Sequence, residues 1–336
     1  MRVLDCFSGI GGFALALEGA AETAAFCEKN ANCRRVLDNL MARGLVTKAP
    51  VFEDITTLTP QQVRALRPDM ITAGFPCQDI SVFGTKLGLE GKRSSLVSHV
   101  LDLARTVPSI KTLFLENSPN FVHLGMTELF AELLRIPGMR ITWGIWSARH
   151  GGALHKRRRW FCVATRAKLP EVKVAYAERP RKEIDVRLRL VPKGSAPHAR
   201  MRHQMLGNSV VPQCVRLAFG LLSAEANRIG RGQVSQVSTP PIPKANPVVR
   251  VHGASALNAT NTWSTAIFSH WTQNRVLKSD IQERALANQI FWDERTIALL
   301  RARGWTGSVG YIDREFDINP EWVELFMGYP RGWTRF

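Results

Sequence analysis

Continuous apolar runs alternate with amphipathic segments through the first half of the chain. The runs are short, are typical of buried strands, and cover residues 3–7, 24–27, 51–52, 68–72, 112–115, 141–147 and 160–164. Apolar residues recur at helical spacing in residues 13–19, 95–106 and 126–135. Strands that alternate with helices predict an α/β fold, in which helices cover both faces of a mostly parallel sheet.

The second half of the chain is patterned differently. Residues 166–202 are basic, interrupted by prolines and without clear periodicity, whereas residues 213–226 show helical spacing. Residues 228–250 are rich in Gly, Ser and Pro, which predicts a linker. Six of the nine tryptophans follow residue 260, which predicts a small, separately folded unit. We expect a main domain at 1–165 and 203–227, a basic insertion at 166–202, a linker at 228–250 and a small C-terminal domain at 251–336.

Polar residues follow the first three predicted strands. Residues 8–12 (Ser-Gly-Ile-Gly-Gly) form a glycine turn before a helix, Glu28 follows the second strand, and Asp54 follows the third. Glycines let the backbone approach a ligand, and an acid about 20 residues past the first strand suits ribose hydroxyls. The pattern predicts a ligand across the carboxyl edge of the sheet, although each acid alone is also typical of an ordinary strand end.

The fourth strand leads into residues 73–81, Ala-Gly-Phe-Pro-Cys-Gln-Asp-Ile-Ser. Pro76 restricts the backbone just before Cys77, and a thiol is the best neutral-pH nucleophile among side chains. The next strand ends at Glu116, so a carboxylate would share this edge with Cys77. These residues predict a nucleophile beside an acid, whereas Cys77 alone is also consistent with an inert buried cysteine.

Composition limits the class of protein. Apolar residues make up 45% and charged residues 22% of 336 positions, which is ordinary for a soluble globular chain. We see neither a run of 18 apolar residues nor a signal-peptide pattern, so we expect no membrane partner. The six cysteines are scattered without a CxxC pair, which predicts no metal site and no disulfide framework and suits a reducing cytoplasm.

Basic residues are concentrated in one segment. The formal net charge is +17, and residues 151–239 carry 18 basic and 5 acidic side chains, a net +13. A segment charged in this way favours a polyanionic partner, with nucleic acid as the leading candidate. A basic surface that only aids solubility is the alternative.

Taken together, these segments resemble the DNA (cytosine-5) methyltransferase family. The resemblance is carried by residues 5–12, 28, 53–56, 74–78, 116–117, 157 with 159, and 207–210, in the family's order and spacing. It implies a Rossmann-like fold for S-adenosylmethionine-dependent methyl transfer, with a seven-stranded sheet and a smaller DNA-recognition domain. It also implies double-stranded DNA as the partner, and we expect a monomer in the cytoplasm of a bacterium or a phage-infected host cell.

The resemblance assigns a role to each matched residue. The implied S-adenosylmethionine contacts are Phe7, Gly9 and Gly11 for the pocket, Glu28 for the ribose, Asp54 and Ile55 for the adenine, and Asn208, Ser209 and Val210 for closure of the site. The implied catalytic residues are Cys77 as nucleophile, Glu116 at the N3 and N4 edge of cytosine, and Arg157 and Arg159 to orient base and carboxylate. Taken singly, Asn208 is also a plausible helix cap, and the two arginines are also typical of a phosphate-facing surface.

The sequence departs from the family pattern in two ways. Leu154, His155 and Ser118 stand where the family usually has proline, glutamine and valine. Residues 318–330 look like a family motif that normally precedes residues 207–210 and is here moved to the C-terminus. We therefore hypothesise a rearranged order, with target recognition contributed by residues 251–330 and 166–202. An appended domain unrelated to DNA is the alternative.

Two other functions share these residues. The tRNA-methylating branch of the family uses the same catalytic set, and the added C-terminal unit and basic segment favour DNA over tRNA. A nucleic-acid-binding protein with a decayed catalytic domain is the second alternative, and the intact Cys77, Glu116 and Asn208 argue against it.

Overall fold

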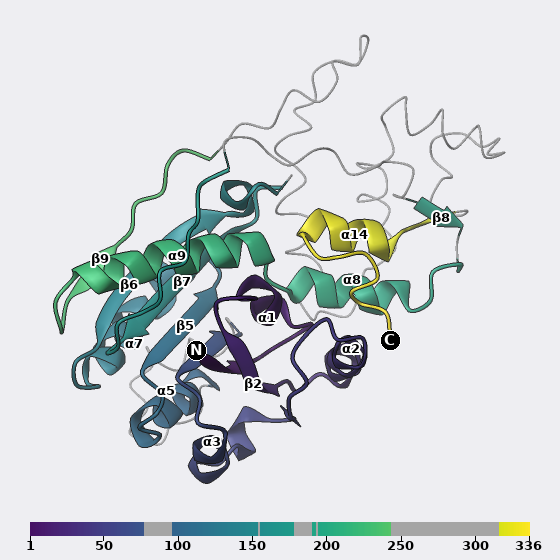
Figure 1. The fold of residues 1–336 in the computed structure, drawn as a ribbon. Coiled ribbons are helices and arrows are strands. Elements are labelled where there is room, and N and C mark those ends of the chain that lie inside the picture. Colours follow the sequence, from purple (N-terminus) through teal and green to yellow (C-terminus); the bar gives the residue numbers. More distant parts are fainter. Residues whose placement is uncertain (77–95, 154, 178–189, 193, 243–315) are drawn as a thin grey trace.

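The computed structural model describes residues 1–76, 96–153, 155–177, 190–192, 194–242 and 316–336 (Figure 1). An eight-stranded sheet forms its centre, in the order β3-β2-β1-β4-β5-β7-β6-β9. The strands are β1 (Arg2–Cys6), β2 (Glu22–Cys27), β3 (Val51–Phe52), β4 (Met70–Gly74), β5 (Thr112–Asn117), β6 (Arg140–Ser147), β7 (Arg158–Thr165) and β9 (Val234–Gln236). β7 runs antiparallel to both β5 and β6, while the other neighbouring pairs are parallel. The predicted α/β class is confirmed.

Helices cover both faces of the sheet, which explains why its strands are continuously apolar. The helices are α1 (Gly12–Ala16), α2 (Ala31–Ala42), α3 (Pro60–Leu66), α5 (Leu96–Thr106), α6 (Phe121–Leu124), α7 (Met126–Leu134), α8 (Ala199–Asn208), α9 (Pro212–Arg228) and α14 (Pro320–Met327), with the 3₁₀ turns η1 (Ile55–Thr57) and η4 (Ala148–Gly151). Alternate strand residues enter two separate cores. Val3 and Phe114 pack with α1, α2, α9 and α14, whereas Leu4 and Leu113 pack with α3, α5 and α7.

The sheet extends into the predicted linker. β9 pairs in parallel with β6, with Ile141 opposite Val234, so the sheet has one strand more than the seven predicted. Residues 228–236 are therefore part of the main domain rather than of a linker. The run Val-Ser-Gln is too short and too polar to be recognised as a strand from the sequence, and its pairing with β6 forms it.

The predicted basic insertion also belongs partly to the main domain. The backbone of Leu169 donates to and accepts from the Asn227 side chain of α9, at 3.0 Å in each direction. Gly220 of α9 lies against Val174, where an added Cβ would be 2.6 Å from a valine methyl carbon. The helix α8 begins at Ala199, inside a segment that we expected to be irregular up to residue 202. Residues 178–189 lie outside the described part of the chain.

The last residues of the chain do not belong to the predicted C-terminal domain. α14 and the residues after it pack against α8 and the C-terminal end of α2 (Figure 1), so residues 319–336 belong to the main domain. A two-stranded antiparallel ribbon of β8 (Leu190–Pro192) and β10 (Phe316–Ile318) precedes them. Most of the predicted recognition unit, residues 243–315, lies outside the described residues.

The stretch Ala199–Arg228 is long and apolar enough, by length and composition alone, to cross a membrane. However, 78% of its most apolar window is buried inside the protein, as in the core helix of a folded domain.

Candidate active site

The carboxyl ends of β1, β4 and β5 lie side by side. In register, Cys6 is opposite Ala73, and Gly74 is opposite Glu116. The glycine turn, the segment that leads to Cys77 and the Glu116 carboxylate therefore meet at one edge, as the sequence predicted. Cys77 itself lies outside the described residues, which end on this side at Pro76.

The glycine turn has a left-handed backbone at three positions. Phe7, Gly9 and Gly11 have φ values of 56°, 54° and 76°. Phe7 has a Cβ, so its conformation is strained, and the surrounding hydrogen bonds compensate for that strain. Ser8 Oγ donates to the Asp5 carbonyl at 2.6 Å, and the Gly11 amide donates to the Ser8 carbonyl at 2.9 Å.

Glu28 joins the end of β2 to this turn. One carboxylate oxygen accepts from the Gly9 amide and the other from the Asn30 amide, both at 2.7 Å. Burial raises the pKa of Glu28, and the two amide donors partly oppose that effect. Among the described residues, apart from Gly9 itself and its two chain neighbours, no atom lies within 4 Å of where a Cβ on Gly9 would stand. The described residues therefore leave space beside Gly9, and the predicted cofactor position would use it.

Asp54 and Ile55 begin η1 beyond β3. Asp54 accepts from the Thr56 amide at 2.9 Å and pairs with Lys29 at 2.9 Å. The Thr56 amide, followed by Lys29, lowers the pKa of Asp54 to about 2. Asp54 is therefore an ionised helix cap, and Ile55 is buried behind it.

Glu116 is buried at the end of β5 and pairs with Arg159 of β7. The Arg159 Nε and a Glu116 carboxylate oxygen are 3.0 Å apart, and the Glu116 side chain is 11% exposed. Burial raises the pKa of Glu116, and the cations of Arg159 and Arg157 only partly oppose it. An added Cβ on Gly74 would be 3.1 Å from the other carboxylate oxygen, so glycine at this position leaves room for the acid.

Asn117 fixes the segment that leads to Cys77. Its side-chain amide donates to the Phe75 carbonyl at 3.1 Å, and the Phe75 ring packs edge-on against Phe121. The backbone is thus held in place two residues before the predicted nucleophile, from the strand that carries Glu116.

Arg157 contacts backbone carbonyls, whereas it is Arg159 that pairs with the Glu116 carboxylate. The Arg157 guanidinium donates to the Gly207 carbonyl at 2.9 Å and to the Ser209 carbonyl at 2.8 Å. It is buried, and that burial, followed by the charge of Arg159, lowers its pKa to about 9. Arg157 therefore joins the residues just before β7 to the segment predicted to close the cofactor site. That segment ends α8 with an exposed Asn208, followed by Ser209 and Val210, which are buried.

His155 occupies a buried position next to this segment. Its ring centroid is 4.7 Å from that of Phe326 in α14. Burial, together with the nearby arginines, lowers its pKa to about 3, so it is neutral. His155, which departs from the family pattern, therefore packs against residues 318–330, the motif that we hypothesise to have moved to the C-terminus. Leu154 lies outside the described residues.

Asp5 is a buried acid to which the sequence analysis gave no role. Its side chain is fully buried in β1 and accepts from the Thr72 hydroxyl at 2.5 Å, while its other carboxylate oxygen has no hydrogen-bond partner among the described residues. Burial raises the pKa of Asp5 to about 7. Its position inside the apolar run of residues 3–7 is the feature of the sequence that could have indicated a buried acid.

The C-terminal segment reaches this edge through contacts that the sequence did not predict. The Trp333 indole donates to the Ile10 carbonyl of the glycine turn at 2.7 Å. The Tyr329 hydroxyl donates to the Val210 carbonyl at 3.0 Å. The hypothesis placed residues up to 330 in a recognition domain, but residues 319–330 pack against the main domain, with Tyr329 next to the glycine turn and Val210.

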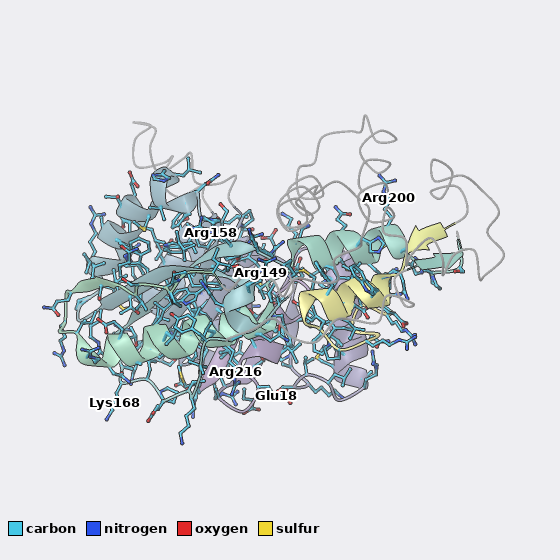
Figure 2. All side chains as sticks on the ribbon, turned by 90° about the horizontal axis from the view of Figure 1, so that it is seen from above. Glu18, Arg149, Arg158, Lys168, Arg200 and Arg216 are labelled. Carbon is cyan, nitrogen blue, oxygen red and sulfur yellow. The ribbon has the colours of Figure 1, made fainter. Side chains whose placement is uncertain are left out.

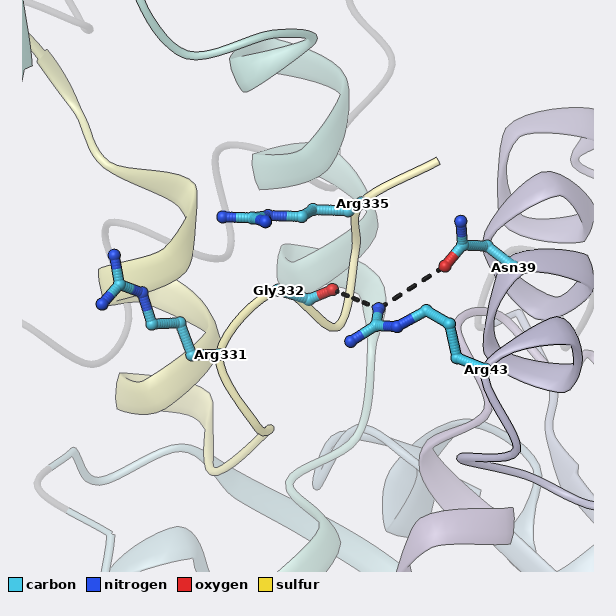
Figure 3. A pocket seen from close by; sticks show the side chains of 5 residues that line it. All are labelled: Asn39, Arg43, Arg331, Gly332 and Arg335. Atoms are coloured by element: carbon cyan, nitrogen blue, oxygen red, sulfur yellow. Dashed lines mark hydrogen bonds between the residues drawn. The ribbon is translucent and has the colours of Figure 1, made fainter.

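A basic pocket of about 500 Å³ lies where α2 meets the C-terminal tail (Figure 3). It is lined by Asn39, Arg43, Arg331, Gly332 and Arg335, none of which was a predicted site residue. The Arg43 guanidinium donates to the Gly332 carbonyl at 2.8 Å, while Arg331 and Arg335 pair with Glu321 of α14. The pocket is therefore part of the attachment of the tail.

The basic residues that cluster in sequence are spread out in space. Figure 2 places Arg158 and Arg200 on one side of the molecule and Lys168 and Arg216 on the other. Arg216 donates to the Ala16 and Glu18 carbonyls, at 3.1 and 2.8 Å. The described basic residues of this segment thus do not all lie on one surface, and Arg216 serves to hold the fold together.

Comparisons with known proteins agree with this geometry. The family model described as C-5 cytosine-specific DNA methylase matches residues 1–193. The chain is 34% identical over 169 residues to the type II methyltransferase M.CviJI of Paramecium bursaria Chlorella virus IL3A, covering 49% of this chain and 43% of that one. It is 30% identical over 173 residues to the type II methyltransferase M2.BsuMI of Bacillus subtilis, covering 49% and 42%. The chain thus matches less than half the length of these relatives.

Among solved structures, the chain is similar to a DNMT2 variant of Spodoptera frugiperda. The TM-score is 0.43 at 22% identity, and the match covers 55% of this chain and 54% of that one.

Proposed function

The chain belongs to the C-5 cytosine-specific DNA methylase family, and we propose that it transfers a methyl group from S-adenosylmethionine to C5 of cytosine in duplex DNA. The family resemblance read from the sequence is thereby confirmed. The observation that carries the proposed activity is Glu116, a buried acid with a raised pKa, held by Arg159 next to the strand that leads to Cys77. A carboxyl group that keeps its proton can donate a hydrogen bond to a base.

Cys77 and Glu116 divide the work on the cytosine ring. C5 of an aromatic cytosine is a poor nucleophile, so the ring must be activated first. The Cys77 thiolate forms a bond to C6, and Glu116 supports the charge that moves onto the ring by donating to N3. C5 then forms a bond to the methyl group as the bond between that methyl and the sulfonium sulfur breaks, and S-adenosylhomocysteine leaves. A base removes the C5 proton, and the C6–S bond breaks to return the thiolate.

The described residues support a position for the cofactor pocket. S-adenosylmethionine supplies an electrophilic methyl group. Phe7, Gly9 and Gly11 shape the turn beside it, and Glu28 provides a carboxylate for the ribose. Asp54 and Ile55 would border the adenine, and Asn208, Ser209 and Val210 would close the site. The space that the described residues leave beside Gly9 supports this assignment.

Duplex DNA is the proposed partner because the reaction requires a base outside the stack. A nucleotide paired in a duplex cannot reach Glu116, so it must be flipped into the pocket. Exposed cations such as Arg158 and Arg200 lie on one side of the protein, where they would contact phosphates (Figure 2). We place target recognition in residues 243–315 and 178–189. The strands that follow these segments in the chain, β10 and β8, pair with each other.

The activity is tested with radiolabelled S-adenosylmethionine and either duplex DNA or tRNA. We expect label in duplex DNA, and a covalent complex with a duplex that contains 5-fluorocytosine. Label in tRNA alone would favour the RNA branch of the family. Neither label nor complex, with an intact fold, would refute a catalytic role. Bisulfite sequencing of DNA from expressing cells then reports the modified sites.

Recognition is tested by deleting residues 251–311 and keeping residues 316–336, which belong to the main domain. We expect the variant to bind S-adenosylmethionine and to lose the site preference of the full chain. Bisulfite profiles that match the full chain would contradict this assignment.

A further inference from the structure

The glycine turn is supported by a residue near the end of the chain. Trp333 is 1% exposed, and its indole N–H donates to the Ile10 carbonyl at 2.7 Å. Ile10 lies between Gly9 and Gly11, the two glycines with a left-handed backbone. An added Cβ on Gly11 would lie 3.9 Å from the Trp333 ring. The indole therefore packs against the turn and satisfies a buried carbonyl in its middle.

Tyr329 joins the same turn to the segment after α8. Its hydroxyl donates to the Val210 carbonyl at 3.0 Å, and the side chain is 2% exposed. An added Cβ on Gly12 would be 2.4 Å from the Tyr329 hydroxyl oxygen and 2.5 Å from a Val210 methyl carbon. Those separations are too short for any Cβ. Gly12 is therefore required by the approach of Tyr329 and Val210 rather than by a ligand.

The tail that carries both residues is itself fixed. The Glu324 carboxylate is fully buried in α14 and accepts from the Gly332 amide, from the Thr334 amide at 2.8 Å and from Arg202 at 2.8 Å. Because the acceptors of Glu324 are filled from both the tail and α8, the position of the tail relative to α8 is determined.

We propose that Trp333 and Tyr329 are positioning residues for the methyl donor. They connect the glycine turn and residues 208–210, the two backbone segments assigned to the cofactor pocket. The proposal rests on the proposed function, because it concerns the affinity of that same pocket. Under this proposal the cofactor site needs Tyr329 and Trp333 in addition to residues 1–227.

The test is the affinity of the full-length protein for S-adenosylhomocysteine, measured by titration calorimetry. Tyr329→Phe removes only the hydroxyl, and Trp333→Phe removes the indole N–H. Each loses one hydrogen bond to a backbone carbonyl, so we expect the Kd to rise roughly fivefold in each variant. In methylation assays we expect the KM for S-adenosylmethionine to rise by a similar factor, while kcat changes less than about twofold.

Trp160→Phe is the matched control. Trp160 is also fully buried, but its indole N–H has no partner among the described residues and its ring packs against Phe121 and Phe130 in the other core. We expect it to lower the Tm without changing the Kd. If Trp333→Phe does not fold, Tyr329→Phe alone decides, because loss of a hydroxyl leaves the packing intact.

Wild-type affinity in both variants, at any Tm, would overturn the proposal and reduce the tail to a structural role. Absence of S-adenosylhomocysteine binding in the wild-type protein would instead refute the proposed function. A Kd that rises equally in Trp160→Phe would also overturn the proposal, because general destabilisation would then explain the change.

Discussion

The buried carboxylate of Glu324 offers a sharp test of how the C-terminal tail is attached. We consider Glu324→Gln, which preserves the size of the side chain but removes its charge. Glu324 is 0% exposed and pairs with Arg202, whose side chain is 6% exposed. The variant leaves the Arg202 cation buried without a counter-ion. It also directs an amide N–H₂ toward N–H donors from Gly332 or Thr334.

The magnitude follows from the burial of both partners. Removing one member of a buried ion pair costs about 3–5 kcal/mol, because the remaining charge stays desolvated. The amide oxygen of glutamine still accepts hydrogen bonds on one side, so we expect a loss of ~3 kcal/mol in the free energy of unfolding. Arg202→Met in the same background removes the stranded cation, so the double variant should recover part of the loss.

The assay is urea-induced unfolding followed by circular dichroism and tryptophan fluorescence. The control is Glu225→Gln, also a helical glutamate with an arginine partner. Its partner Arg228 is 81% exposed, so we expect a loss below ~1 kcal/mol. Equal losses in Glu324→Gln and Glu225→Gln would refute the reasoning, because the Glu324 pair would then behave like a solvated one.

Three further predictions concern the acids and the thiol. Burial raises the pKa of Asp5 from 3.8 to about 7 in the folded protein. As the pH rises, the unfolded chain therefore loses this proton at a lower pH than the folded protein does. The free energy of unfolding should therefore fall by up to ~4 kcal/mol between pH 4 and pH 7, and urea titrations of Asp5→Asn should lack that component. Glu116→Gln should lower kcat by roughly 10²-fold or more while S-adenosylhomocysteine binding persists, and a smaller loss would contradict its role as donor to N3. Cys77→Ser should abolish methyl transfer and the 5-fluorocytosine complex, whereas retained transfer would exclude Cys77 as the nucleophile.

The sequence by itself determined the sheet and the contents of its carboxyl edge. Strands covered on both faces must be apolar throughout, so β1, β4, β5 and β7 are visible as continuous runs. Parallel strands place their carboxyl ends at one edge, so Glu28 and Glu116 were correctly expected to lie there. Glu116 and Arg159 form an ion pair, and the role of Arg159 in orienting that carboxylate stays a prediction.

Only the tertiary structure decided which segments enclose that edge. Trp333 and Ile10 are 323 positions apart, and no local period or propensity links residues at such a separation. Arg157 and Arg159 are alike in sequence, yet one contacts the carbonyls of residues 207 and 209 and the other contacts Glu116. Arg157 precedes β7 whereas Arg159 lies within it, and which groups cover each position depends on the whole chain. For the same reason residues 319–336, which looked in sequence like the end of a separate domain, are part of the main one.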